Sequence, residues 1–138
     1  RHRLEVDLPP GPVPVLADPV RISQVVSNLL NNAAKYTPDG GRIRLSVGRE
    51  GGRAVVRVRD DGIGIAPEML ARVFEPFVQV PSALARAHGG LGIGLSLART
   101  LVEMHGGEID ARSEGEGKGA EFVVSLPALS PTTPEAAR

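Results

Sequence analysis

The chain has 138 residues, its sixteen Lys and Arg balance sixteen Asp and Glu, and 41% of its residues are hydrophobic. This length fits a single domain, and the charge balance argues against a dedicated nucleic-acid-binding protein, which normally carries a basic excess. The absence of cysteine excludes a disulfide framework and a thiolate metal site.

No apolar run in the sequence is long enough to cross a bilayer, and no signal-peptide pattern opens it. We therefore expect a cytoplasmic domain. The chain begins with Arg1 rather than Met, so we also expect a piece of a longer protein, one that can itself be anchored in a membrane.

The N-terminal part of the chain predicts two strands and a helix. Residues 1–8 alternate between apolar and charged side chains, which is typical of a half-buried strand, and a short second strand is expected at 13–16. Asp18 and Pro19 together predict a helix start, with an N-cap acceptor followed by proline at the first helical position. The helix is expected to end before Pro38. Its core face follows from apolar residues at helical spacing: Ile22, Val25, Val26, Leu29, Leu30 and Ala33.

The rest of the chain predicts alternating strands and helices. In chain order we expect strands at 43–47 and 54–58 joined by a hairpin at Gly51-Gly52, a short helix at 67–70, a long loop at 74–90, a helix at 92–105, and strands at 108–113 and 120–126. This order predicts an α/β (α+β) two-layer sandwich, with about three helices on one face of a mixed, mostly antiparallel sheet. The domain is expected to span 1–127, and 128–138 to be a disordered tail.

The first long helix carries a polar face. Asn28 and Asn32 are four residues apart and therefore lie one turn apart on the same side. An amide oxygen can coordinate Mg²⁺ without adding negative charge beside a triphosphate. Lys35 could meet a phosphate, and Tyr36 offers a ring face to a base. The alternative is a polar stripe that simply faces solvent.

A carboxylate followed by glycines ends the strand at 54–58. In the sequence Asp60-Asp61-Gly62-Ile63-Gly64-Ile65, the glycines suit a sharp turn or close approach to a ligand. A carboxylate there can accept from an exocyclic amino group, which would select adenine over guanine. An Asp-Gly hairpin turn is the alternative, although the two isoleucines favour a lined pocket.

A glycine-rich segment, Gly89 to Gly94, leads directly into the helix at 92–105. Its backbone N–H groups and the positive helix end favour phosphate, whereas a flexible hinge is the alternative. The segment lacks the Gly-Lys-Ser/Thr ending of a P-loop. In the preceding loop, Arg86 and His88 could approach phosphates or be ordinary solvated side chains.

Together these segments resemble the catalytic, ATP-binding domain of sensor histidine kinases, within the wider family of Bergerat-fold (GHKL) ATPases. Five segments over about residues 1–127 match the family's motifs in order: the N box at 28–37, the first glycine box at 60–65, the F box at 74–77, the second glycine box at 90–95 and the third at 115–122.

The resemblance implies ATP and Mg²⁺ as ligands and assigns roles along the site. Asn32 would hold Mg²⁺ with Asn28 nearby, Asp60 would bond the adenine amino group, Phe74 would help to anchor a lid over ATP at 78–89, and Gly92 would shape its hinge. The full set of expected ATP-binding residues is Asn28, Asn32, Lys35, Tyr36, Asp60, Gly62, Gly64, Ile65, Phe77, Arg86, Gly90, Leu91, Gly92, Gly94 and Leu95.

Two departures from relatives define the expected reaction. Branches of the family that hydrolyse ATP carry a glutamate where this chain has Asn28, and an amide is not a useful general base. None of His2, His88 and His105 has the setting of a phosphoacceptor. We therefore expect a domain, monomeric by itself, that presents the γ-phosphate of ATP to a histidine on a separate dimerisation domain, with a response regulator reached through the whole protein. The alternatives are a regulatory nucleotide-sensing module and an anti-sigma-type serine kinase.

Overall fold

The structure, a computed structural model, describes residues 2–76 and 94–129. Its elements follow the predicted order closely, and the helix at the N box is its longest. The elements are β1 (Arg3–Asp7), α1 (Pro19–Lys35), β2 (Arg42–Glu50), β3 (Arg53–Asp60), α2 (Pro67–Leu70), α4 (Gly94–Met104), β4 (Glu108–Arg112) and β5 (Ala120–Pro127).

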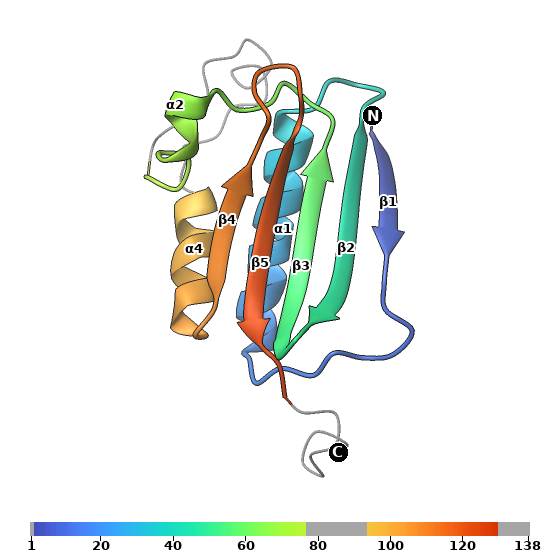
Figure 1. Ribbon diagram of the computed structural model, residues 1–138, viewed down its shortest axis with the longest axis vertical. Coiled ribbons are helices and arrows are strands. Elements are labelled where there is room, and N and C mark those ends of the chain that lie inside the picture. The colour runs from blue at the N-terminus through green and yellow to red at the C-terminus, as the bar shows by residue number, and fades with distance from the viewer. Residues whose placement is uncertain (1, 77–93, 130–138) are drawn as a thin grey trace.

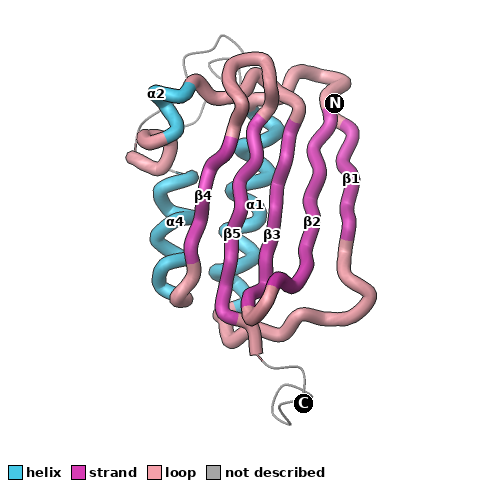
Figure 2. The backbone as a smooth tube through the Cα atoms, in the orientation of Figure 1, coloured by secondary structure: helices cyan, strands magenta, loops and turns pink. Residues whose placement is uncertain are grey.

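One five-stranded sheet, in the order β1-β2-β3-β5-β4, forms the first layer. β1 pairs in parallel with β2, and the other three pairings are antiparallel. Helices α1 and α4 lie side by side behind the sheet in Figure 1, and Figure 2 shows the same two layers. The predicted two-layer sandwich with a mixed, mostly antiparallel sheet is therefore confirmed.

Helix α1 begins and ends where the local sequence predicts. The Asp18 carboxylate accepts from the backbone N–H of Val20 at 3.0 Å and of Arg21 at 3.3 Å, and so caps the first turn. Val25 and Leu29 on the core face have exposed fractions of 1% and 0%. Burying side chains of this size contributes roughly 1.5–3 kcal/mol each, so the amphipathic pattern fixes which face of α1 turns toward the sheet.

The core is mainly aliphatic, as the near absence of aromatic residues requires. Phe122 on β5 and Val58 on β3 are its centre, and Ala98 on α4 packs there without any exposed surface on its side chain. Phe74 meets Phe122 edge to face, with ring centroids 6.0 Å apart. This contact fastens the segment after α2 to the sheet.

Strand β1 differs from the prediction. All five of its residues are exposed, and Leu4 and Val6 retain 55% and 53% of their surface. The alternation correctly predicts a strand, but the half-buried interpretation is wrong because β1 is the edge strand and α1 lies over the middle of the sheet. No strand forms at 13–16 either, where the structure has only an isolated bridge between Val15 and Ala128.

Two residues beyond the predicted domain end at 127 are still hydrogen-bonded to the rest of the domain. The backbone N–H of Ala128 donates to Gly52 O at 2.9 Å, and that of Leu129 donates to Pro14 O at 2.8 Å. The remainder of the predicted tail, 130–138, lies outside the described residues. Within the part of the chain that the structure describes, no helix has the length and apolarity that a membrane span requires.

Candidate functional site

One end of the molecule, at the top of Figure 1, gathers the segments that the sequence singles out. The C-terminal end of α1, the end of β3 and the turn between β4 and β5 meet there, and α4 begins lower, beside Asn28 of α1. The backbone N–H of Ile63 donates to Tyr36 O at 3.0 Å, which joins the turn after β3 to the end of α1. The N box and the first glycine box are therefore neighbours in space.

Asp60 is the charged group at the centre of this end. Only 5% of its surface is exposed, and its Oδ1 accepts from Gly62 N at 2.9 Å. Burial raises the pKa of Asp60 from 3.8 to about 6, although backbone donors at Gly62 and Ala120 oppose that increase. A buried carboxylate whose charge is only partly compensated is suited to accept a hydrogen bond from a ligand.

The two glycines after Asp60 are needed for contacts within the protein. A β-carbon on Gly62 would overlap the carbonyl oxygen of Tyr36, and one on Gly64, whose φ is +75°, would overlap that of Gly115. Gly62 was expected to let a base approach. In this structure its lack of a side chain lets the end of α1 approach instead.

The turn between β4 and β5 closes against the first glycine box through Ser113, a residue that the sequence analysis did not single out. Ser113 Oγ accepts from Ile65 N at 3.0 Å and donates to Gly119 O at 2.7 Å. Gly117 N donates to Ile63 O at 2.7 Å in the same closure. A serine at the end of a strand and before a glycine-rich turn was the available signal.

The polar face of α1 points toward α4. Asn28 and Asn32 are half-buried, whereas the neighbouring Asn31 is exposed. Asn28 Nδ2 donates to Gly94 O, the first residue of α4, at 3.1 Å. A stripe that merely faced solvent would not make this contact, so Asn28 helps to place the start of α4 beside the amide face.

Lys35 and Tyr36 follow one turn later. The Lys35 ammonium lies 5.5 Å from the centre of the Tyr36 ring, and partial burial lowers the Lys35 pKa. A cation at the end of the amide-bearing face is placed to meet an anionic ligand there.

The donor set at this end suits a magnesium ion only in the presence of a ligand that brings further oxygens. Among residues 2–76 and 94–129, no group of three or more His, Asp or Glu side chains is placed to hold a metal. Asn32 offers one neutral oxygen, and the Asn28 amide nitrogen is already engaged. Mg²⁺ usually keeps a few protein ligands and takes the rest from phosphates and water, so these residues fit that arrangement.

The remaining predicted site residues divide into two groups. Gly94 and Leu95 start α4, with Leu95 packed partly against the core, and Ile65 belongs to the core with 5% of its surface exposed. Phe77, Arg86, Gly90, Leu91 and Gly92 lie outside the described residues, as do His88 and the predicted lid at 78–89.

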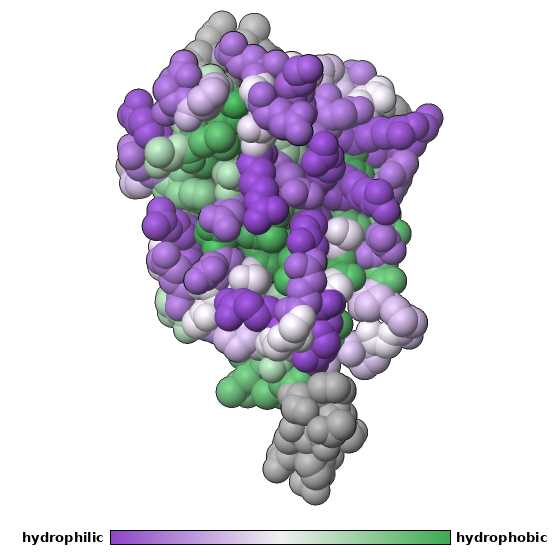
Figure 3. Space-filling model, viewed as in Figure 1, coloured by the Kyte–Doolittle hydropathy of each residue, from purple (hydrophilic) through white to green (hydrophobic). Residues whose placement is uncertain are grey.

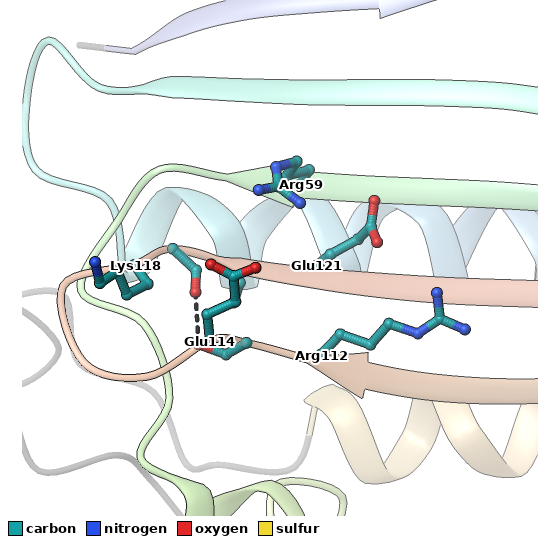
Figure 4. Close-up of a pocket in the computed structure, with 8 residues that line it drawn as sticks. Arg59, Arg112, Glu114, Lys118 and Glu121 are labelled. Carbon is teal, nitrogen blue, oxygen red and sulfur yellow. Dashed lines mark hydrogen bonds between the residues drawn. The ribbon is translucent and has the colours of Figure 1, made fainter.

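A pocket of about 220 Å³ lies on the opposite face of the sheet and is not the predicted cleft. Figure 3 views that face, which is largely hydrophilic. Figure 4 shows Arg59, Arg112 and Lys118 around the pocket with two glutamates. Glu121 is opposite both Arg59 and Arg112 in the strand register, so charges of both signs alternate across the strands. The full lining is Arg59, Arg112, Ser113, Glu114, Lys118, Gly119, Ala120 and Glu121.

Comparison with known protein families matches residues 17–130 to the family described as histidine kinase-, DNA gyrase B-, and HSP90-like ATPase. The match covers most of the chain, including every element from α1 to β5. The chain belongs to this family. Within the family, the chain resembles the ATP-binding catalytic domains of sensor histidine kinases in both sequence and fold.

Among curated relatives, the circadian input-output histidine kinase CikA of Synechococcus elongatus is 45% identical over 111 residues, which are 80% of this chain and 15% of that protein. The sensor histidine kinase RcsC of Escherichia coli is 41% identical over 127 residues, 92% of this chain and 13% of that protein. The chain thus spans about a seventh of the length of these two relatives.

Solved structures agree on the fold. The mycobacterial sensor histidine kinase MprB superposes with a TM-score of 0.79 at 29% identity, covering 92% of this chain and 82% of that one. Full-length ShkA in complex with AMPPNP gives the same TM-score at 31% identity, covering 96% of this chain and 27% of that one.

Proposed function

We propose that the chain is the ATP-binding catalytic domain of a two-component sensor histidine kinase, with the domain spanning residues 1–127. It binds Mg·ATP and presents the γ-phosphate to a histidine on a separate dimerisation domain. The relatives are named as sensor histidine kinases, and one structural neighbour is a complex with an ATP analogue. The observation that carries the proposal is the position of a buried carboxylate, Asp60, in the strand end whose turn contacts the C-terminal end of α1, the helix that carries the amide face.

The purine is proposed to bind at Asp60. The ionised carboxylate accepts from the exocyclic amino group of adenine, whereas guanine has a carbonyl oxygen at that position and would repel it. Because Asp60 is 95% buried, this contact forms away from water and contributes strongly to selectivity.

The triphosphate is proposed to lie along the amide face of α1 toward the first turn of α4. Asn32 would hold the magnesium ion with Asn28 beside it, and the ion would neutralise charge on the phosphate oxygens. The start of α4 supplies backbone N–H groups and the positive end of its dipole, and the Lys35 ammonium adds a point charge. The glycines at 90, 92 and 94 and the side chains of Phe77 and Arg86 retain their predicted roles in this proposal.

Transfer, rather than hydrolysis, is the reaction that these residues favour. Asn28 is neutral and tied to Gly94 O, so it offers no base for an attacking water. The chain's task is then positioning and electrostatic stabilisation of the phosphoryl group.

The histidines that the structure describes already have partners within the domain. His2 Nε2 lies 2.6 Å from Thr37 O, and His105 bonds both Leu101 O and the N–H of Asp18. These contacts support an acceptor histidine on another domain. The whole protein would dimerise there and pass phosphate to a response regulator, with this domain in the cytoplasm.

The test mixes the chain with the dimerisation domain of its parent protein and ATP labelled at the γ-phosphate. We expect acid-labile, base-stable label on the dimerisation domain, and none with Asp60→Asn. Nucleotide binding without label transfer would favour a regulatory module, and acid-stable label on a partner's serine would favour a serine kinase; either result overturns the kinase proposal.

A further inference from the structure

Helices α1 and α4 lie side by side, and hydrogen bonds join them near both ends of α4 (Figure 1). Nearer the proposed nucleotide site, Asn28 Nδ2 donates to Gly94 O at 3.1 Å. At the far end, the backbone N–H of Asp18 donates to His105 Nε2, also at 3.1 Å. The start of each helix is thus tied to a later part of the other, so the two helices are antiparallel.

His105 makes this far link with a ring whose two nitrogens both have a task. Its Nδ1 lies 2.7 Å from Leu101 O, one turn earlier in α4. A carbonyl oxygen can only accept, so Nδ1 carries the proton and donates it. The lone pair of Nε2 is then free to accept from the N–H of Asp18. The ring therefore joins the last turn of α4 to the residue that caps α1.

Both residues of this link belong to firmly held helix ends. Asp18 O accepts from Ile22 N at 3.0 Å, and the Asp18 carboxylate caps the first turn, so a bond to its N–H is a bond to the whole of α1. The end of α4 lies close against the sheet, since a β-carbon on Gly107 would overlap Ser125 O of β5. The link therefore fixes α1 relative to a part of α4 that is itself anchored.

The rest of the interface offers less control over how far one helix slides along the other. Leu29 of α1 and Ala98 of α4 are buried in the same core, and burial of apolar surface is not directional. A hydrogen bond, by contrast, tolerates only a narrow range of distance and angle. Such bonds at both ends of α4 therefore specify one alignment of the two helices.

We propose that His105 is a positioning residue for the phosphate end of the nucleotide site. By holding α1 and α4 in one alignment, it keeps Gly94 and the first turn of α4 beside the amide face of α1. The inference rests on the ATP-binding function proposed above and extends it to a side chain at the opposite end of the two helices. His105 acts through α4 rather than on the nucleotide.

The test compares His105→Asn with His105→Gln by titration calorimetry with Mg·ATP, well below the unfolding temperature of each variant. Asparagine can still donate to Leu101 O but is too short to accept from Asp18, so ATP binding should be about fivefold weaker, the size of one ordinary hydrogen bond. Glutamine places an amide oxygen near the position of Nε2, and its affinity should stay within about twofold of the original. Met104→Gln, at a neighbouring exposed position, is the matched control and should leave the affinity unchanged.

Thermal unfolding of the same variants separates positioning from plain stability. His105→Asn should unfold at a lower temperature than the original protein, as loss of any hydrogen bond would cause. If it nevertheless binds ATP as tightly as the original while fully folded, the link only stabilises the fold and the inference is overturned. Equal losses of affinity in the asparagine and glutamine variants would overturn it as well.

A double-mutant cycle with Asn28→Ala tests whether the two interhelical bonds specify the same alignment. If they do, His105→Asn should weaken ATP binding by less than about twofold once Asn28→Ala has already released the helices. Additive losses would show that the two bonds act independently and would contradict the inference.

The outcomes also separate this inference from the function beneath it. If His105→Asn binds ATP normally while Asp60→Asn loses binding, the inference is wrong and the proposed function stands. If Asp60→Asn also binds ATP normally, the proposed nucleotide site itself is wrong.

Discussion

Replacing Asp60 with asparagine should stabilise the domain while it removes ATP binding. Burial raises the Asp60 pKa from 3.8 to about 6, and since one pKa unit corresponds to about 1.4 kcal/mol, the buried charge costs roughly 3 kcal/mol at neutral pH. Asparagine can still accept from Gly62 N through its oxygen and carries no charge. It must bury an amide nitrogen instead, so we expect a net gain of about 1–2 kcal/mol.

The gain depends on pH in a defined direction. The unfolded chain ionises Asp60 near pH 4 while the folded chain holds the proton until about pH 6, so the carboxyl's contribution to stability is fully present below pH 4 and is lost as the pH rises through 6. Urea unfolding of both proteins from pH 4 to 8 measures this directly. The two curves should cross at about pH 5, because only the amide cost remains at low pH, and at pH 7.5 the variant should be the more stable protein by about 1–2 kcal/mol.

ATP binding should change in the opposite sense. With its oxygen bonded to Gly62 N, the asparagine turns an N–H₂ group toward the adenine amino group, so two donors meet and affinity should fall by roughly 30-fold or more. In the original protein affinity should itself weaken below about pH 6, where Asp60 becomes protonated. Equal stability of the two proteins at every pH would refute the buried-charge reasoning, and equal ATP affinity would refute the base-recognition role.

Three further substitutions test other parts of the site. Gly62→Ala forces a β-carbon against the carbonyl oxygen of Tyr36 and should lower the free energy of unfolding by about 2–4 kcal/mol. The control Gly52→Ala, which has nothing within 4 Å of its new β-carbon, should lower it by less than about 1 kcal/mol. Similar losses in the two variants would contradict the close approach at Gly62. Asn32→Asp should weaken Mg·ATP binding about tenfold, because it places a negative charge beside the phosphates. The control Asn31→Asp, at an exposed position, should leave the affinity unchanged. Equal effects of the two variants on the affinity measured by calorimetry would show that Asn32 is not the metal ligand. Ser113→Ala should destabilise the domain by about 1–3 kcal/mol, because the backbone groups of Ile65 and Gly119 lose their hydrogen-bond partner. An unchanged midpoint in urea unfolding would show that the hydrogen bonds of Ser113 do not stabilise the fold.

Helix α1 and the motif segments could be predicted because their signals are local. Asp18 and Pro19 specify a helix start through groups within one turn, and the position of Asp60 follows from the alternation of the strand before it. The sequence therefore locates the carboxylate and the amide face without any knowledge of their distance. Their meeting depends on the contact between Ile63 N and Tyr36 O, which no local pattern encodes.

The features that the sequence predicted wrongly or did not reveal depend on which segments, distant in the sequence, pack against them. Alternation predicts that Leu4 and Val6 face a core, but whether a helix covers an edge strand is decided by packing elsewhere in the chain. Thr37 was overlooked because a threonine after a helix is ordinary. It becomes unusual only when Gly41 and Gly62, which are close in space, enclose it and its hydroxyl is left without a hydrogen-bond partner among the residues that the structure describes.

The most direct test of the account is a crystal structure of the chain with a non-hydrolysable ATP analogue and Mg²⁺. The account predicts that the purine amino group lies within hydrogen-bond distance of the Asp60 carboxylate and that the phosphates lie beside Asn32 and the start of α4. A nucleotide bound instead in the pocket on the open face, with its phosphates on Arg59 and Lys118, would contradict it.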